Sequence, residues 1–320
     1  MLMSAQFLEN FLQALIAGLL TRAIYGLLCV GLSVIFGVMR VINFAHGDFM
    51  MLGLYVAFYA FGLLGLQSIF GATTAPYVAA LLAGPVIFLA GIMVHKFLVS
   101  KVTGMRGSTL AAEGHYAQLI LTLGVALILQ NGGLYWFGSA PVSIPTPLAS
   151  SAWEVGPLYG EAISVFVNQG QTVSAFIAVV VVLVFVRFMG RSQLGQSLRA
   201  AADNPEAATS MGIDVGKAHQ LAFGLGVAIT AIGGGLLASG TSFQPYVGLE
   251  YVIVMYAGVV LGGLGSIAGA FLGGLTIGLV QQSSTLVLPN QLQNTAIFVV
   301  FLEIILLRPH GLFGKAARRT

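Results

Sequence analysis

The polar residues that could do chemistry are concentrated in two short interruptions of long apolar runs. The first reads Arg40-Val-Ile-Asn43-Phe-Ala-His46-Gly47-Asp48. An imidazole and a carboxylate this close together suit general acid–base chemistry, so one hypothesis is an intramembrane enzyme that uses His46 and Asp48. Asn43, His46 and Asp48 also suit a gate or polar cluster of a transport pathway, because irregular backbone is tolerated beside a water-filled cavity. A third interpretation is an ordinary cytoplasmic turn whose acid favours a helix N-terminus.

The second interruption reads Thr241-Ser-Phe-Gln244-Pro245-Tyr-Val-Gly248-Leu-Glu250. Like the first, it ends in a glycine, an acid and a new apolar run. Interrupted segments in the two halves of a transporter are the best sequence indication of a central site. Gln244 and Glu250 are therefore further candidates for the pathway or gate. The competing interpretation is a periplasmic turn in which Glu250 is the acid at a helix start.

Several kinds of site have no motif in the sequence. No G-x-x-x-x-G-K-[ST] string is present, so the chain cannot bind ATP by a Walker A loop and the energy must come from a partner. The chain has no CxxC, HExxH or clustered histidines, and we expect no metal, no cofactor and no catalytic residue. Only Asp48, Glu250 and Glu303 among the acids lie near apolar runs, which argues against an ion-coupled carrier. A channel or ion-coupled carrier that works alone remains an alternative.

A third polar segment, 190–218, has the punctuation of a short helix. Asp203 or Asn204 suits the N-cap, and Pro205 suits the first helical position. Glu206 complements the helix dipole, and Gly212 is placed to end the helix in the left-handed conformation. Such a helix has no core of its own, so we expect it to dock on another protein.

Composition sets the environment of these segments. Hydrophobic residues make up 58% of the 320 residues and charged residues only 7%, against about 25% in soluble domains. The mean hydropathy is +0.95. The bilayer must therefore be the solvent, and the net charge of +3 indicates cytoplasmic anchoring rather than nucleic-acid binding. We expect an all-α, polytopic transmembrane bundle of about 8 spans (7–9), including broken or re-entrant segments, with 1–320 as one transmembrane domain.

The basic residues orient this bundle. All but two of the 13 Lys and Arg fall in the groups 96–106, 187–217 and 308–319, which the positive-inside rule places in the cytoplasm. The loop 138–172 has no Lys or Arg and is expected in the periplasm. Arg22 splits the first apolar stretch, so its first part could instead be an interfacial helix. The remaining expectation is that 251–288 returns to its starting side, as two short spans or a re-entrant hairpin. The expected spans are 11–39, 48–66, 75–95, 117–137, 173–189, 219–240 and 291–307.

Four segments together resemble the LivH/LivM family of branched-chain amino-acid ABC-transporter permeases, and the LivH branch most closely. INFAHGD and DNPEAATSMGI are the most specific strings within them. Glu206-Ala207-Ala208-x-x-x-Gly212 resembles the EAA motif, which forms the coupling helix of such permeases. The classical motif continues to a Leu-Pro that is absent here, as in this branch. The four segments are 26–53, 119–138, 197–215 and 259–275.

The resemblance implies a permease subunit of a bacterial inner-membrane importer rather than an enzyme. Its partners would be membrane lipid, a second, LivM-like permease, two cytoplasmic ATPases and a periplasmic solute-binding protein. Asn204, Pro205, Glu206, Ala207, Ala208 and Gly212 would couple it to the ATPases. The solute would be a branched-chain or related amino acid, with urea, amides and aromatic acids as alternatives.

Overall fold

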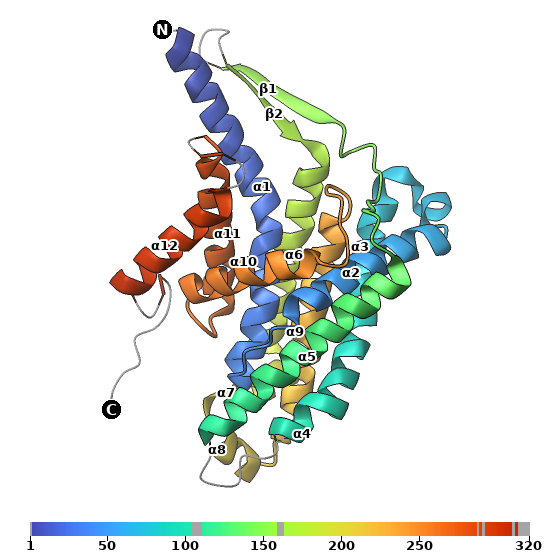
Figure 1. The fold of residues 1–320 in the computed structure, drawn as a ribbon, viewed down its shortest axis with the longest axis vertical. Coiled ribbons are helices and arrows are strands. Elements are labelled where there is room, and N and C mark those ends of the chain that lie inside the picture. Colours follow the sequence, from blue (N-terminus) through green and yellow to red (C-terminus); the bar gives the residue numbers. More distant parts are fainter. Residues whose placement is uncertain are drawn as a thin grey trace.

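The computed structural model describes residues 2–103, 111–158, 163–286, 288–289, 292–308 and 311–312, and it is a polytopic helical membrane bundle (Figure 1). In these residues five helical stretches are long and apolar enough to cross a membrane, and two shorter apolar helices accompany them. The helices are α1 (Leu2–Met39), α2 (His46–Leu63), α3 (Leu66–Val94), the π-helix η1 (His95–Val99), α4 (Ser100–Thr103), α5 (Ala111–Phe137), α6 (Gln169–Arg191), α7 (Gln193–Asp203), α8 (Pro205–Ser210), α9 (Val215–Leu237), α10 (Val247–Gly262), α11 (Ile267–Ser284) and α12 (Gln293–Leu307).

The first helix is continuous, so the alternative of a separate interfacial helix before Arg22 is wrong. Its 38 residues give a length of about 57 Å, which exceeds the thickness of the hydrocarbon core. Arg22 does not interrupt it, because the guanidinium lies 4.3 Å from the ring centroid of Tyr25 and only 9% of the residue is exposed. The aliphatic part of Arg22 packs on Gly278, where a larger residue would collide with it.

α11 runs antiparallel to α1 along much of its length. Each step of four residues along α1 is matched by a step of four back along α11, which brings one face of each helix into repeated contact. Small residues allow this close approach, and dispersion then holds the helices together in lipid. The contacts pair Gly18 with Gln282, Arg22 with Gly278, and Gly26 with Gly274.

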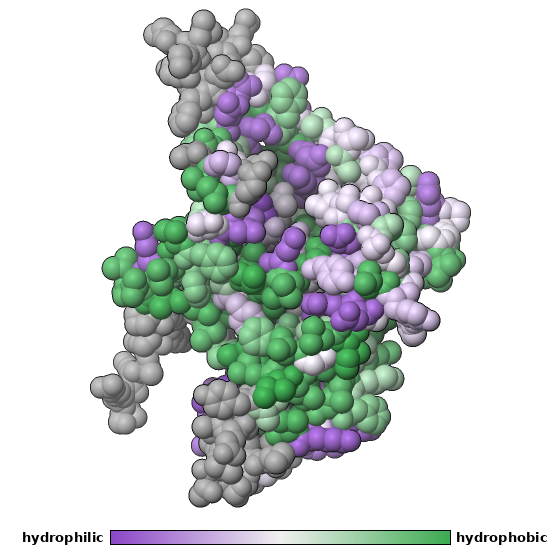
Figure 2. Space-filling view, viewed as in Figure 1, coloured by the Kyte–Doolittle hydropathy of each residue, from purple (hydrophilic) through white to green (hydrophobic). Residues whose placement is uncertain are grey.

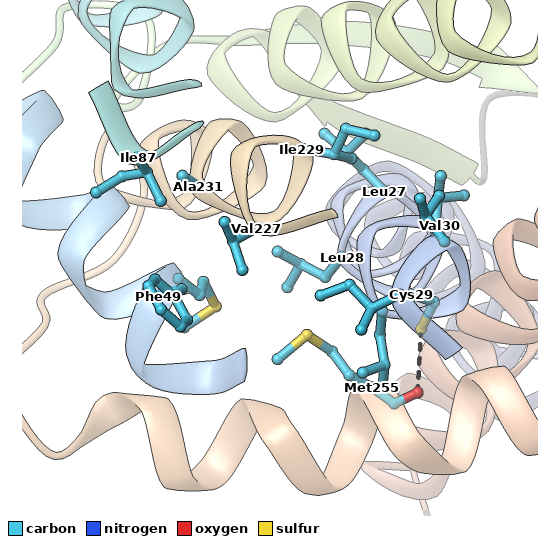
Figure 3. Close-up of a cluster of buried hydrophobic side chains, with 14 of the residues drawn as sticks. Leu27, Leu28, Cys29, Val30, Phe49, Ile87, Val227, Ile229, Ala231 and Met255 are labelled. Atoms are coloured by element: carbon cyan, nitrogen blue, oxygen red, sulfur yellow. Dashed lines mark hydrogen bonds between the residues drawn. The ribbon is translucent and has the colours of Figure 1, made fainter. Parts of the chain in front are cut away.

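α9 lies in the middle of the bundle and contacts α1, α2 and α3. In Figure 3, Val227, Ile229 and Ala231 of α9 lie among Leu27 and Leu28 of α1 and the side chains of neighbouring helices. Cys29 is fully buried here, and its thiol donates a hydrogen bond to the carbonyl of Met255 (Sγ to O, 3.6 Å). The lone cysteine is thus a small packing residue, as is usual for a buried thiol.

The fold is all-α, as predicted, with one short β-hairpin in a loop. The loop 138–172 contains an antiparallel hairpin of β1 (Ala152–Leu158) and β2 (Ile163–Asn168). The side-chain amide of Gln13 in α1 pairs with the outer edge of β2, donating to the carbonyl of Phe166 (2.7 Å) and accepting from its N–H (2.8 Å). This hairpin and the α7–α8 segment lie at opposite ends of the bundle, as the charge pattern predicts (Figure 1).

The stretch 251–288 forms a helical hairpin. α10 crosses the bundle obliquely, and α11 returns along α1 after a turn at 263–266 (Figure 1). Gly263 and Gly265 both have positive φ, and Gly265 lies against Gly37 near the end of α1. Hydrophobic side chains cover the face over α5, α10 and α12 (Figure 2), as expected for a chain surrounded by lipid and membrane partners.

Candidate functional site: a central helix crossing and a short capped helix

The first interruption reaches the middle of the bundle. α1 ends at Met39, and α2 begins at His46, whose Nε2 lies 2.7 Å from Oγ1 of Thr230 in α9. Thr230 packs on Gly31 of α1, nine residues before Arg40 and thus about 13 Å along the helix axis. His46 therefore lies inside the bundle, because the chain turns back into it after α1.

The second interruption reaches the same depth from the other end. Thr241 is still hydrogen-bonded to the end of α9, through Leu237 (N to O, 3.1 Å). Seven residues later Gly248, in the first turn of α10, lies against Gly47 in the first turn of α2. A Cβ atom on Gly248 would lie 2.7 Å from the carbonyl oxygen of Gly47. Glu250 lies in the first turn of α10, as the competing interpretation predicts, and the close approach of Gly47 and Gly248 shows that the two interruptions meet.

The polar side chains of the first interruption are brought together beside this crossing. Asn43, His46 and Asp48 are 0, 0 and 2% exposed. Asp48 lies in the first turn of α2, as predicted, and Gln130 of α5 is its side-chain partner. Within the described part of the chain, Nδ2 of Asn43, Nδ1 of His46 and Oδ1 of Asp48 have no hydrogen-bond partner. These buried groups therefore retain unused capacity to bind water or solute.

Gln244 and Glu250 do not join this cluster. Both are exposed, and Glu250 lines a separate cavity of about 130 Å³ together with Leu249, Asn294 and Phe298. Of the predicted pathway residues, the structure therefore brings three together and leaves two apart. It also adds Thr230, which sequence reasoning missed because a single threonine in an apolar helix carries no signal.

The geometry does not support acid–base chemistry. The His46 ring lies within hydrogen-bonding distance of a threonine hydroxyl, and the side chain near Asp48 is the amide of Gln130. Across the described ranges no group of three or more His, Cys, Asp or Glu side chains is placed to hold a metal ion. The crossing can instead fix the positions of two helix ends and hold polar side chains inside the apolar bundle.

The short helix expected within 190–218 forms as α8. The Asn204 side chain caps α8 by accepting hydrogen bonds from the N–H groups of Glu206 (3.1 Å) and Ala207 (3.0 Å). At the other end Gly212 has φ +84°, and its N–H donates to Thr209. The N–H of Ile213 donates to Ala208 (2.9 Å), which completes a Schellman motif. Both ends of α8 are therefore fixed by hydrogen bonds.

Neighbouring caps hold α8 between two further helices. Ser192 caps α7, and Asp214 caps α9 by accepting from the N–H of Lys217 (3.0 Å). That hydrogen bond lowers the pKa of the exposed Asp214 carboxyl group below its usual value. Ala208 is buried, whereas Met211 is 84% exposed at the tip of the segment. Sequence reasoning missed the caps at Ser192 and Asp214, although a serine or aspartate before an apolar run is a recognised signal.

A family model described as the permease component of the branched-chain amino acid transport system matches residues 14–307. The chain belongs to this family. The permease is 30% identical to the high-affinity branched-chain amino acid permease protein LivH of Salmonella typhimurium, over 98% of both chains. It is equally similar to LivH of Escherichia coli K12, and 29% identical to BraD of Pseudomonas aeruginosa over 96% of both chains. No solved structure matches the permease.

Family membership makes the permease a transport subunit that spans the membrane, rather than an enzyme. The match covers the central crossing and α8 together. It does not extend to individual residues, so the roles of those two features rest on their geometry.

Proposed function

We propose that the permease is a membrane subunit of a bacterial inner-membrane ABC importer that translocates branched-chain or related amino acids. Two cytoplasmic ATPases would bind ATP and Mg²⁺, and a periplasmic binding protein would deliver the solute. A second, LivM-like permease would complete the channel. Full-length similarity to LivH and BraD supports the solute class and the transport role.

The observation that carries this proposal is the construction of α8. An isolated six-residue helix is unstable in water, because nucleation costs more than so few hydrogen bonds return. Here Asn204 and Gly212 fix both ends, and Ala208 anchors the helix on its neighbours. The polar, exposed side of α8 is thus held in a fixed position at one end of the bundle (Figure 1). A rigid exposed helix beneath a membrane domain is suited to receive force from an ATPase.

The sidedness follows from the charges. α8 lies in the basic segment 187–217 and faces the cytoplasm, and 138–172 with its hairpin faces the periplasm. Counting the α10–α11 hairpin as one unit gives eight membrane elements, with the N-terminus outside. The other elements of this count are α1, α2, α3, α5, α6, α9 and α12.

In the proposed mechanism, closure of the ATPase dimer moves α8, and α7 and α9 pass the movement into the bundle. α9 carries Thr230, which holds His46 at the start of α2. A shift of α9 therefore acts directly on the Gly47–Gly248 crossing. Asn43, His46 and Asp48 form the polar cluster of the gate, while Gln244 and Glu250 lie toward its periplasmic side.

The test is coupled transport by the reconstituted importer, with ATPases, second permease and binding protein. Glu206→Arg together with Gly212→Ala should abolish ATP-driven uptake while the permease stays in the membrane and in the complex. Gly190→Ala is the control, because a Cβ there meets nothing within 4 Å and the residue lies in the last turn of α6, directly before the α7–α8 segment. Unchanged uptake in the double variant would contradict the proposal.

The solute is tested separately. A ligand screen on the binding protein encoded beside the permease should return leucine, isoleucine or valine. Binding of urea, amides or aromatic acids in that screen would leave the importer assignment unchanged but would replace the proposed solute. Transport by the purified permease in liposomes without any ATPase would instead support the stand-alone channel or carrier.

A further inference from the structure

The segment between α1 and α2 is irregular backbone at membrane depth. Arg40 has φ +54°, and the chain is non-helical from there to Asn43, with a turn before α2. The N–H of Phe44 faces Oγ1 of Thr122 in α5 (3.4 Å). Thr122 lies five residues inside the apolar span Ala117–Phe137, about 8 Å along the helix axis. Phe44 is therefore within the hydrocarbon zone, between the inner end of α1 and the central crossing.

Side chains along this segment alternate between two environments. Val41, Asn43 and Ala45 are buried, whereas Ile42 and Phe44 are 39 and 40% exposed. Alternation with a period of two is the geometry of an extended chain. One edge of the segment thus packs on the protein, and the other edge opens away from it.

The backbone of the open edge is unpaired. Among the described residues, none accepts a hydrogen bond from the N–H of Val41 or Ile42, and none donates to the carbonyl of Ile42 or Phe44. Such groups cannot face lipid tails, which offer no hydrogen bonds, so irregular backbone at this depth must lie inside protein or beside water. An exposed helix such as α6 has no such restriction, because its backbone groups pair within the helix.

We propose that Ile42 and Phe44 line the water-filled passage of the transported amino acid, which rests on the proposed function. The ring of Phe44 lies 5.9 Å from that of Tyr256, so the apolar wall continues onto α10. This wall suits an aliphatic side chain, and the unpaired N–H and C=O groups suit the charged ends of an amino acid. The cluster of Asn43 and His46 lies behind the wall rather than in the passage.

Thiol labelling tests which residues face water. Cys29 is the only cysteine of the permease and is fully buried, so a single introduced cysteine can be followed on the permease band after its partners are separated from it. The variants Ile42→Cys and Phe44→Cys probe the wall, and Asn43→Cys probes the inward-facing edge of the same segment. Leu183→Cys is the control for lipid exposure, since this α6 residue is 62% exposed. Each variant is reconstituted as the full importer in lipid nanodiscs, and its ATPase activity verifies assembly.

A charged, water-soluble thiol reagent should label Ile42→Cys and Phe44→Cys at least about tenfold faster than Leu183→Cys, because only a hydrated thiol forms the reactive thiolate. The two rates should also change when vanadate traps the nucleotide-bound state. Rates no faster than at Leu183 in either state would overturn the proposal. Faster labelling at Asn43 than at Phe44 would overturn it too, because the passage would then run through the polar cluster.

A transport readout separates this inference from the proposed function. Phe44→Trp should reduce ATP-driven uptake of leucine by about tenfold or more with the complex assembled, whereas Leu183→Trp should leave it unchanged. Normal uptake by the Phe44 variant would overturn only the proposal that Phe44 lines the passage, and would leave the importer function in place. Absence of ATP-driven uptake by the unaltered complex would overturn the importer, while labelling would still report where water lies.

Discussion

The backbones of Gly47 and Gly248 touch at the point where the first turns of α2 and α10 cross. A Cβ atom on Gly248 would lie 2.7 Å from the carbonyl oxygen of Gly47 and 2.9 Å from Oδ1 of Asp48. The colliding atoms include backbone of a buried helix, which cannot rotate away as a flexible side chain can. Two residues 201 positions apart in the sequence therefore fix the depth at which both helices begin.

Gly248→Ala should destabilise the permease by about 1–3 kcal/mol, because it overpacks a contact between two backbones. The expected result is a lower thermal unfolding midpoint in detergent and reduced uptake by the reconstituted complex. Gly62→Ala in α2 is the control, since a Cβ there meets nothing within 4 Å and alanine favours a helix. Equal midpoints for the two variants would show that the helices do not cross as described.

Thr230→Val should cost about 1–3 kcal/mol, because it removes the hydroxyl that pairs with the buried Nε2 of His46 at almost constant volume. Thr230→Ser should restore most of the loss. Thr276→Val is the matched control, because the exposed Thr276 hydroxyl donates to the carbonyl of Leu272 in its own helix (2.8 Å). Thermal unfolding of the three variants measures the difference, and a loss at Thr276 equal to that at Thr230 would contradict the assignment.

Asn204→Ala should remove about 1 kcal/mol from α8, since two N–H groups lose their cap. Asn204→Asp and Asn204→Ser should retain the cap. Hydrogen exchange of the amides of Glu206 and Ala207 should accelerate in the alanine variant only. ATP-driven uptake should fall most in the alanine variant and least in the two variants that keep the cap. Exchange rates that are equal in all three variants would show that the cap does not hold the helix.

Asp214 should make the start of α9 sensitive to acid. Its folded-state pKa is lowered by the hydrogen bond from the Lys217 N–H, so the stabilisation is present above the unfolded value near 4 and is lost as pH falls through the folded value. Asp214→Asn keeps a capping oxygen that does not titrate. Protection of the Lys217 amide, corrected for intrinsic exchange, should therefore fall below pH 4 in the parent permease and stay level in the variant.

Much of this architecture follows from the sequence alone. Long apolar runs predict the spans, because the bilayer leaves no alternative to helices that satisfy their own backbone. The α8 segment is equally local, since Asn204, Pro205 and Gly212 act through hydrogen bonds and φ angles within a few residues. The clustering of Lys and Arg predicts which ends of the bundle lie together. Each of these features depends on neighbouring residues or on the solvent.

Only the tertiary structure decided how deep the two interruptions lie and what they contact. The sequence pattern of a glycine and an acid after an apolar run is the same in a surface turn and in a central crossing. The difference arises from contacts between α1, α2, α9 and α10, which close approach of small residues permits but does not specify by position. For the same reason the sequence could not show that Asn43 faces inward and Phe44 outward, since that depends on which edge of an extended segment packs on its neighbours.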